Sequence, residues 1–286
     1  LYIVGGFVRD LLLDHPSLDF DLVVEGDAIG RAKKFSEKFG GRITTHKRFG
    51  TAKWHLKTPV TAESQQSNLL TELLHGNTPL NTLDFISART EFYTHPTALP
   101  TVEHGSIKLD LHRRDFTINT LAMRLDGVHF GDLLDYWGGH NDLQKGAIRV
   151  LHSLSFIDDP TRMLRAVRYE QRYSFQISPR TLDLLMEAST LMDRVSGDRI
   201  RHELDSILDE ENATAMLERL NKLGLLEAIH KDIMWNEEIA RKIASLEPHT
   251  PGAQWGLEPD LVGARLKRDL AYILWFVQLP IYRVQG

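Results

Sequence analysis

The sequence predicts an α+β protein, with a mixed sheet and helices in the first 130 residues and an all-α remainder. Three observations support this class. Short segments of the first part alternate apolar and polar residues, which is typical of half-buried strands. From Pro160 onward, apolar residues recur with the 3.6-residue period of amphipathic helices. The length of 286 residues suits about two domains.

The first elements follow from these periods and from the glycines. An apolar run at Leu1–Val4 predicts a strand that ends in a glycine pair, and Phe7–Leu13 then has helical spacing. The segment Leu18–Val24 alternates apolar residues with aspartates and predicts a half-buried strand. A basic amphipathic helix is expected at Ala28–Phe39, because Gly40-Gly41 follows it as a stop signal.

Later elements of the first part are read in the same way. We expect strands at Phe49–Leu56 and Leu83–Arg89, loops at Pro59–Pro79 and Tyr93–Ser106, and a helix at Phe116–Met123.

Composition excludes several classes of protein. Hydrophobic residues make up 42% of the chain, which is enough for a folded core. The absence of cysteine excludes disulfide frameworks and thiolate metal sites, and we predict a cytoplasmic protein. No apolar stretch approaches the ~20 residues of a membrane helix. The net charge of −5 means that a polyanion would have to bind a local patch.

A glycine pair between the first strand and the first helix is the first candidate binding feature. Gly5 and Gly6 let backbone amides approach a ligand closely, and the helix start offers free N–H groups to an anion. Arg9, one turn later, adds a positive charge for a phosphate. Taken alone, this pattern is better explained by a tight turn with a surface arginine.

Carboxylates on neighbouring strands are the second feature. Asp19 and Asp21 are two residues apart on a predicted strand and therefore share one face, about 6–7 Å apart. Two such carboxylates suit a pair of Mg²⁺ ions. Asp84 enters another apolar strand, and it would complete a three-carboxylate cluster if that strand pairs beside the first. An exposed strand end is the alternative explanation for Asp84.

An arginine pair before a predicted helix is the third feature. Arg114, Asp115 and Asn119 can together reach sugar hydroxyls and phosphates. Arg113 and Arg114 oppose the dipole of a helix that begins there, which hints at a bound anion.

An acidic residue and three arginines recur every third position in the helical part. Asp159, Arg162, Arg165 and Arg168 follow one side of a helix. Arginine donors with an aspartate acceptor match the edges of cytosine and adenine and mismatch those of guanine and uracil. A basic helix that faces RNA is the alternative explanation.

Taken in order, these motifs resemble those of the class II tRNA nucleotidyltransferases and the related bacterial poly(A) polymerases, within the polymerase-β-like superfamily. The similar segments are GGFVRD, LDFDLVVEGDA, LDFISARTE, RRDFTINTLAM, DLLDYWGGHNDLQKGAIRVL and DDPTRMLRAVRYEQRYSF, within the first 60% or so of the chain. The resemblance implies a catalytic head at 1–130, a helical neck that recognises the base at 131–190, and a helical RNA-binding body at 191–286.

The resemblance also implies roles for the candidate residues. Asp19 and Asp21 correspond to ligands of two Mg²⁺ ions, and Asp84 to a third catalytic carboxylate. The remaining residues correspond to nucleotide contacts, namely Gly5, Gly6, Arg9, Arg114, Asp115, Asn119, Asp159, Arg162, Arg165 and Arg168. The implied reaction is template-independent addition of C or A, from CTP or ATP, to the 3′ end of tRNA, with release of pyrophosphate.

Three activities remain open at this point. The head motifs do not separate addition of C, CC, A or CCA to tRNA from synthesis of poly(A). A third alternative, from another class, is an RNA-binding module with an inactive head. We expect tRNA and a nucleoside triphosphate as partners, without DNA or membrane.

Overall fold

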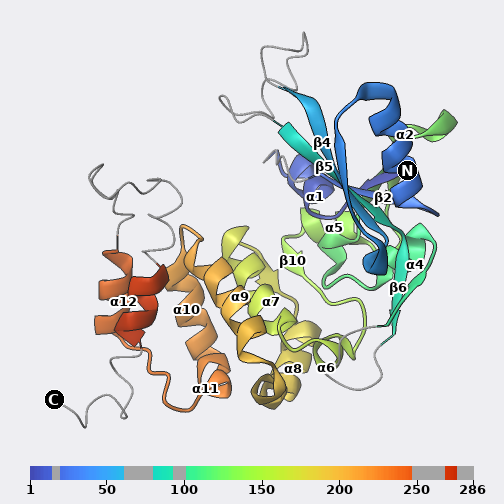
Figure 1. Ribbon diagram of the computed structural model, residues 1–286. Coiled ribbons are helices and arrows are strands. Elements are labelled where there is room, and N and C mark those ends of the chain that lie inside the picture. The colour runs from blue at the N-terminus through green and yellow to red at the C-terminus, as the bar shows by residue number, and fades with distance from the viewer. Residues whose placement is uncertain (15–19, 61–79, 93–100, 247–267, 276–286) are drawn as a thin grey trace, which may run out of the picture. The chain divides into compact units, whose positions relative to one another are not determined.

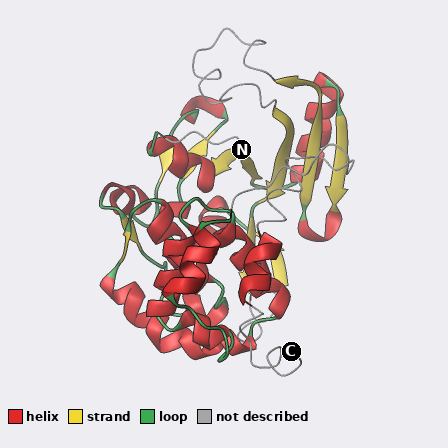
Figure 2. Cartoon of the chain, turned by 90° about the vertical axis from the view of Figure 1, so that its left-hand side faces the viewer, coloured by secondary structure: helices red, strands yellow, loops and turns green. Residues whose placement is uncertain are grey.

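The computed structural model describes residues 1–14, 20–60, 80–92, 101–246 and 268–275, in two compact units (Figure 1). The first unit contains residues up to 145 together with 149–151, and the second contains 146–148 and the residues from 152 onward. Strands concentrate in the first unit and helices in the second (Figure 2). Among the described residues, no helix has the length and apolar character needed to cross a membrane.

Seven described strands of the first unit form one mixed sheet. They are β1 (Tyr2–Val4), β2 (Asp21–Val24), β3 (Arg42–His46), β4 (Thr51–Val60), β5 (Leu80–Ser87), β8 (Ala122–Arg124) and β9 (Leu133–Leu134). Their order is β3-β4-β5-β2-β1-β8-β9. The neighbours β2 and β5 run parallel, whereas the other neighbouring strands are antiparallel.

Helices pack on the two faces of this sheet. The predicted helix Ala28–Phe39 is confirmed as α2: the Asp27 side chain accepts from Gly30 N at 2.9 Å at its start, and Gly40 ends it. The ring of Phe35 packs against Trp54 and Phe85, which seals α2 onto β4 and β5. On the other face, α4 (Ile107–His112) buries two apolar side chains against Tyr2, Val4 and Val23.

Short helices complete the first unit. They are α1 (Gly6–Leu12), α5 (Gly139–Gln144) and the 3₁₀ turns Lys47–Phe49, Thr117–Asn119 and Gly127–His129.

The prediction of a helix at Phe116–Met123 is wrong. The chain forms the 3₁₀ turn Thr117–Asn119 and then enters β8, which pairs with β1. Phe116, Ile118 and Leu121 are all fully buried, so this short apolar run has no solvent-facing side. Periodicity does not separate a helix from a buried strand in such a run.

The two predicted loops are partly strand in the structure. The strand β7 (Thr101–His104) pairs with β6 (Arg89–Phe92), so the described end of the expected loop Tyr93–Ser106 is a strand. Pro59 belongs to β4, whereas residues 61–79 and 93–100 lie outside the described part of the chain.

The second unit is a helical assembly, as the sequence predicts. Its helices are α6 (Ser155–Asp158), α7 (Arg162–Arg172), α8 (Pro179–Ala188), α9 (Gly197–Leu208), α10 (Ala213–Lys222), α11 (Leu225–Ile229) and α12 (Glu237–Ala244). Figure 1 shows α7, α9 and α10 side by side, and their core includes Val167, Ile207 and Leu217. The buried Glu170 of α7 accepts from Arg219 of α10 at 2.7 Å and thereby ties the two helices together.

Candidate active site

Two acidic residues lie side by side on the parallel strands of the sheet. Asp21 of β2 is the register partner of Asp84 of β5, so the strand pairing that the sequence left as a condition is present. Neighbouring strands are about 4.8 Å apart, so both carboxylates start from adjacent positions on the same face. Asp19, the other predicted metal ligand, lies outside the described residues.

A lysine from the next strand faces this pair. Lys53 of β4 is the register partner of Asp84, and its Nζ lies 3.1 Å from Asp84 Oδ2. The ion pair is partly exposed, so solvent screens it and makes it replaceable. Hard carboxylate oxygens are the ligands that Mg²⁺ prefers, and adjacent acids repel one another unless a cation lies between them. The residues at this position therefore fit a Mg²⁺ site, although no group of three potential ligands gathers among the described side chains.

The glycine pair begins at the same end of the sheet. Ile3 is the register partner of Leu22, so Gly5 follows β1 beside the point where β2 starts at Asp21. Gly5 has φ +68° and donates to Leu121 O at 2.9 Å. A Cβ on Gly5 would collide with Nη1 of Arg114. The turn thus requires glycine because a guanidinium lies directly against its backbone.

The first and third sequence motifs meet in a buried polar network. Arg9 is 4% exposed, and its three guanidinium nitrogens donate to Asp10 and to Asn119 Oδ1. The amide nitrogen of Asn119 donates to Asp115 Oδ1 at 2.8 Å, which also accepts from Phe116 N. In this structure Arg9 orders the base of the glycine turn, and its predicted contact with a phosphate stays a prediction.

The arginine pair has a partner that sequence reasoning missed. Arg113 Nη2 lies 2.9 Å from Asp110 Oδ1, and Arg114 Nη2 lies 3.4 Å from Oδ2 of the same fully buried carboxylate. Both arginines follow the last turn of α4, where positive charge suits the helix dipole. The expected conflict with a helix dipole is wrong, because the 3₁₀ turn Thr117–Asn119, and not an α-helix, follows them directly. A single acid near arginines in a short apolar segment carried too little signal to identify this pairing.

In the second unit, Asp159 and Arg162 lie at the N-terminal end of α7, where each is held by hydrogen bonds. Asp159 Oδ1 accepts from the backbone and the hydroxyl of Thr161 and from Arg199 Nη2, at 3.0, 2.7 and 2.7 Å. Arg162 is 6% exposed and donates to Ser155 Oγ at 2.7 Å. Both groups are therefore held by specific partners, and each side chain has a fixed position relative to α7.

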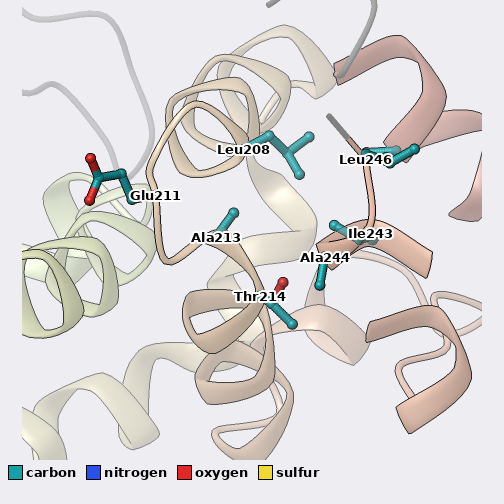
Figure 3. A pocket seen from close by; sticks show the side chains of 8 residues that line it. Leu208, Glu211, Ala213, Thr214, Ile243, Ala244 and Leu246 are labelled. Atoms are coloured by element: carbon teal, nitrogen blue, oxygen red, sulfur yellow. The ribbon is translucent and has the colours of Figure 1, made fainter. Parts of the chain in front are cut away.

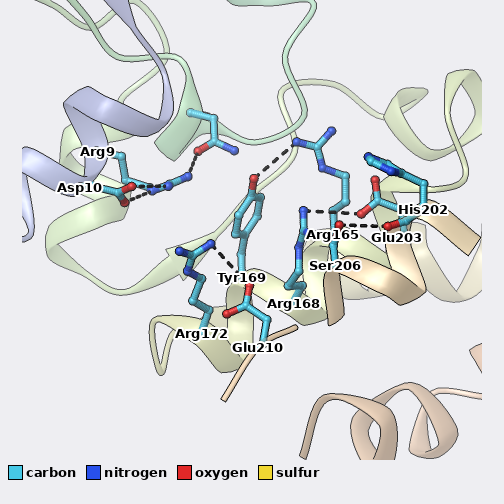
Figure 4. Close-up of polar contacts among 11 residues, drawn as sticks. Arg9, Asp10, Arg165, Arg168, Tyr169, Arg172, His202, Glu203, Ser206 and Glu210 are labelled. Atoms are coloured by element: carbon cyan, nitrogen blue, oxygen red, sulfur yellow. Dashed lines mark hydrogen bonds and ion pairs between the residues drawn. The ribbon is translucent and has the colours of Figure 1, made fainter. Parts of the chain in front are cut away.

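Arg165 and Arg168 lie on the next turns of α7 and face α9 (Figure 4). Both arginines contact the Tyr169 ring: the guanidinium carbons of Arg165 and Arg168 lie 6.0 and 5.6 Å from the ring centroid. Arg168 Nη2 is 3.5 Å from the buried Glu203 of α9. Burial raises the pKa of Glu203, and the charges of Arg165 and Arg168 oppose that rise. Sequence analysis missed Glu203, because one acid in an amphipathic helix is unremarkable until its burial is known.

We expect Glu203→Gln to change how stability depends on pH. Because the folded protein raises the pKa of Glu203, its favourable contribution is complete below the ordinary pKa and is lost as pH rises through the raised value. A glutamine cannot ionise, so the variant should gain stability relative to the wild type as the pH is raised from about 4 into the neutral range.

Melting temperatures of both proteins across this range would check this expectation. Glu211→Gln, at an exposed acid of the same unit, is the matched control. A difference in melting temperature that does not vary with pH would contradict it.

A small cavity of about 110 Å³ also lies in the second unit (Figure 3). Its lining is mainly apolar and comes from Leu208 of α9, Ala213 of α10 and Ile243 of α12, among others. None of the predicted site residues lines it. It has the size of a packing gap between three helices and carries no chemistry for a nucleotide.

Two protein-family models match this chain. The model described as the poly(A) polymerase head domain matches residues 1–149, which is more than half of the sequence. The chain belongs to this family. A second model, described as a probable RNA- and SrmB-binding site of polymerase A, matches residues 174–235. Membership of the poly(A) polymerase head family confirms the resemblance stated from the motifs, and the α+β head with a helical remainder is also confirmed.

Proteins similar to this chain include tRNA nucleotidyltransferases. The A-adding tRNA nucleotidyltransferase of Geobacter sulfurreducens is 44% identical over 82% of this chain and 24% of that protein. The CC-adding tRNA nucleotidyltransferase of the same bacterium is 29% identical over 94% of this chain and 55% of that protein. The solved Thermotoga maritima CCA-adding enzyme complexed with tRNA matches with a TM-score of 0.71 and 33% identity, over 96% of this chain and 58% of that chain. The chain thus spans between a quarter and three fifths of these relatives.

Proposed function

We propose that this protein adds adenosine from ATP to the 3′ end of tRNA, as an A-adding tRNA nucleotidyltransferase. The observation that carries this proposal is the in-register pair Asp21 and Asp84 beside the Gly5-Gly6 turn, within a poly(A) polymerase head domain. The higher identity to an A-adding than to a CC-adding relative, 44% against 29%, favours adenosine as the nucleotide. We assign the catalytic head to 1–130, the neck to 131–190 and the RNA-binding body to 191–286.

The chemistry proposed for the head is an in-line displacement. Asp19 and Asp21 would hold two Mg²⁺ ions, and such ions would supply positive charge that favours loss of the 3′-hydroxyl proton and offsets the charge of the triphosphate. Asp84 would act as a third carboxylate that helps to hold one of these ions, and Lys53 would balance its charge. The 3′-oxygen forms a bond to the α-phosphorus, the bond to the β-phosphate oxygen breaks, and pyrophosphate leaves.

Recognition of the nucleotide is proposed for two groups of residues. The amide of Gly6 and the guanidinium of Arg114 would bind the triphosphate at the turn that Gly5 shapes, while Asn119 and Asp115 would face its ribose. On α7, Asp159 would accept from the adenine amino group and Arg162 would donate to N1. Arg165 and Arg168 would contact phosphates. The selection of the base by protein side chains explains why no nucleic-acid template is needed.

A primer-extension assay tests the proposed activity. Purified protein with Mg²⁺ receives tRNA transcripts that end at the discriminator base, at CC or at CCA, each with CTP, ATP or both. We expect one adenosine on the CC transcript and nothing on the others. Addition of C would move the assignment to CC or CCA synthesis, and long A tails on any RNA would indicate a poly(A) polymerase. No incorporation under any condition would favour an inactive head.

We expect Arg162→Ala to relax the choice of nucleotide more than it slows transfer. The buried guanidinium is proposed to supply donors that suit adenine and mismatch guanine, and alanine removes that discrimination. The ratio of kcat/KM for ATP over GTP should fall by about tenfold, equivalent to about 1.4 kcal/mol. Arg180→Ala, at an exposed position of the same unit, should leave the ratio unchanged. An unaltered ratio in Arg162→Ala would count against the proposed base recognition.

A further inference from the structure

Positive charge is concentrated in one segment of the first unit. Residues 28–57 contain nine of the 34 lysines and arginines of the chain but only one of its 39 acidic residues. The chain as a whole carries a net charge of −5. Mixed signs are the ordinary pattern of a soluble surface, so a strongly basic segment in an acidic protein indicates an anionic partner.

Four of these cations and one aromatic ring gather where α2 turns into β3. We call this group the basic corner, and its members are Lys34, Lys38, Phe39, Arg42 and Lys57, all of which are exposed.

The geometry of the chain brings the basic corner together. Lys34 and Lys38 are one helical turn apart on α2. The stem of Lys57 packs against the turn that ends α2, since a Cβ on Gly40 would lie 3.0 Å from Lys57 Cδ. Arg42 is the register partner of His55, and Lys57 follows two residues later on β4, within reach of a diagonal contact.

In the described part of the chain, these cations have no counter-ion. Among the described residues, none of the four side chains forms an ion pair with a carboxylate. Like charges one turn apart on a helix are mildly destabilising. A charged edge strand protects a sheet against pairing with other chains, and this explains Arg42 on β3. It does not explain Lys34 and Lys38, which lie on a helix.

The aromatic ring of the basic corner is fixed and open to solvent. Phe39 is 55% exposed, and Lys38 Nζ lies 5.1 Å from its ring centroid. The ring rests on Phe35 and Trp54, with centroids 6.1 and 6.3 Å away, and Trp54 Nε1 donates to Gly40 O at 2.9 Å. An exposed aromatic ring held among cations is the arrangement with which proteins bind unpaired bases and the adjoining phosphates.

We propose that the basic corner binds the backbone of the RNA substrate, with an unpaired base stacked on Phe39. This inference rests on the proposed function, which supplies an RNA as the substrate. Arg42 is in register with His55, which pairs with Thr82 of β5, so Arg42 lies two strands and two residues from Asp84, about 12 Å in the plane of the sheet. An RNA whose end reaches the carboxylates would therefore meet the basic corner within a few nucleotides of that end.

RNA binding, measured apart from catalysis, tests this proposal. Fluorescence anisotropy of a labelled tRNA transcript ending at CC is recorded without nucleotide and with chelator, at several salt concentrations. The variant Lys34→Gln, Lys38→Gln, Arg42→Gln, Lys57→Gln should bind at least about tenfold more weakly at low salt. Its slope of log affinity against log salt should be shallower by about 3, because each lost phosphate contact removes about 0.7–0.9.

A charge-matched control separates the basic corner from overall charge. The variant Lys108→Gln, Arg124→Gln, Lys145→Gln, Lys242→Gln removes four cations elsewhere on the surface and should bind within about twofold of the wild type. Equal losses in the two variants, wild-type affinity in the corner variant, or no RNA binding by the wild type would each overturn the proposal. Seven of the eight positions are exposed and Arg124 is half-buried, so melting curves would verify folding.

Two further readouts distinguish this proposal from the proposed function. In the primer-extension assay, the corner variant should show a raised KM for tRNA and an unchanged kcat. A wild type that binds RNA through the corner but transfers no nucleotide would refute the activity and leave the corner intact. Transfer by a corner variant with wild-type RNA affinity would refute the corner alone.

The variant Phe39→Leu tests the stacking contact. Leucine keeps an apolar side chain but cannot stack on a base, so RNA binding should weaken several-fold. Unchanged RNA affinity would refute the stacking contact.

Discussion

Replacement of Asp21 by alanine is expected to abolish nucleotide transfer and leave the fold intact. Asp21 starts β2 beside Asp84, at the position proposed for Mg²⁺. Loss of one metal ligand should lower kcat by at least about 10³-fold, equivalent to about 4 kcal/mol of transition-state stabilisation. Removal of one of two adjacent negative charges also relieves repulsion, so the melting temperature should stay the same or rise.

This expectation has a control of equal charge. Asp132→Ala removes an exposed carboxylate of the same unit and should retain wild-type transfer. Single-turnover extension of the CC-ended transcript gives the rate, and calorimetric titration with Mg²⁺ reports directly on the metal site. Transfer at a wild-type rate by pure Asp21→Ala protein would remove the metal assignment.

The largest effect on stability is expected for Arg9→Met. The guanidinium is buried and donates to Asp10 and Asn119, so its removal leaves a poorly solvated carboxylate and an amide oxygen without their donor. Breaking a buried ion pair from one side costs about 3–5 kcal/mol. Methionine fills most of the space, so the lost polar contacts dominate the change in the free energy of unfolding.

Urea unfolding followed by circular dichroism would measure this loss. Arg31→Met, at an exposed site on α2, is the matched control and should change the free energy by less than about 0.5 kcal/mol. A loss below about 1 kcal/mol in Arg9→Met would mean that water replaces the guanidinium, which would contradict the buried network.

Elements with clear end signals were predictable from the sequence. The helix α2 has the predicted bounds because Asp27 caps its start and Gly40-Gly41 ends it. The strand Arg42–His46 was not predicted, since an edge strand with few apolar residues shows no alternation strong enough to identify it. The helix Ile107–His112 has too few turns to display a period. Chain segments that depend on tertiary contacts for their stability are those that local patterns miss.

In the candidate site, too, some features were predictable from the sequence and others were not. The side-by-side position of Asp21 and Asp84 was predictable, because polar residues that enter apolar strands indicate a shared sheet end. The partners of the arginines were not predictable. Asp110 beneath Arg113 and Glu203 beside Arg168 are ordinary acids in sequence, and only their burial gives them a role.

The parallel pairing of β2 with β5 has a consequence for how the head folds. These strands lie about 60 positions apart in the chain, and the β3–β4 hairpin and α2 lie between them. Local contacts such as the hairpin form early, whereas a pairing of high contact order is delayed by the entropy of closing its loop. We therefore expect the two acids to meet late, after most of the neighbouring apolar surface has been buried. Mutual repulsion between them acts on the final assembly of the head, and a divalent cation added during refolding should accelerate that last step without changing the earlier ones.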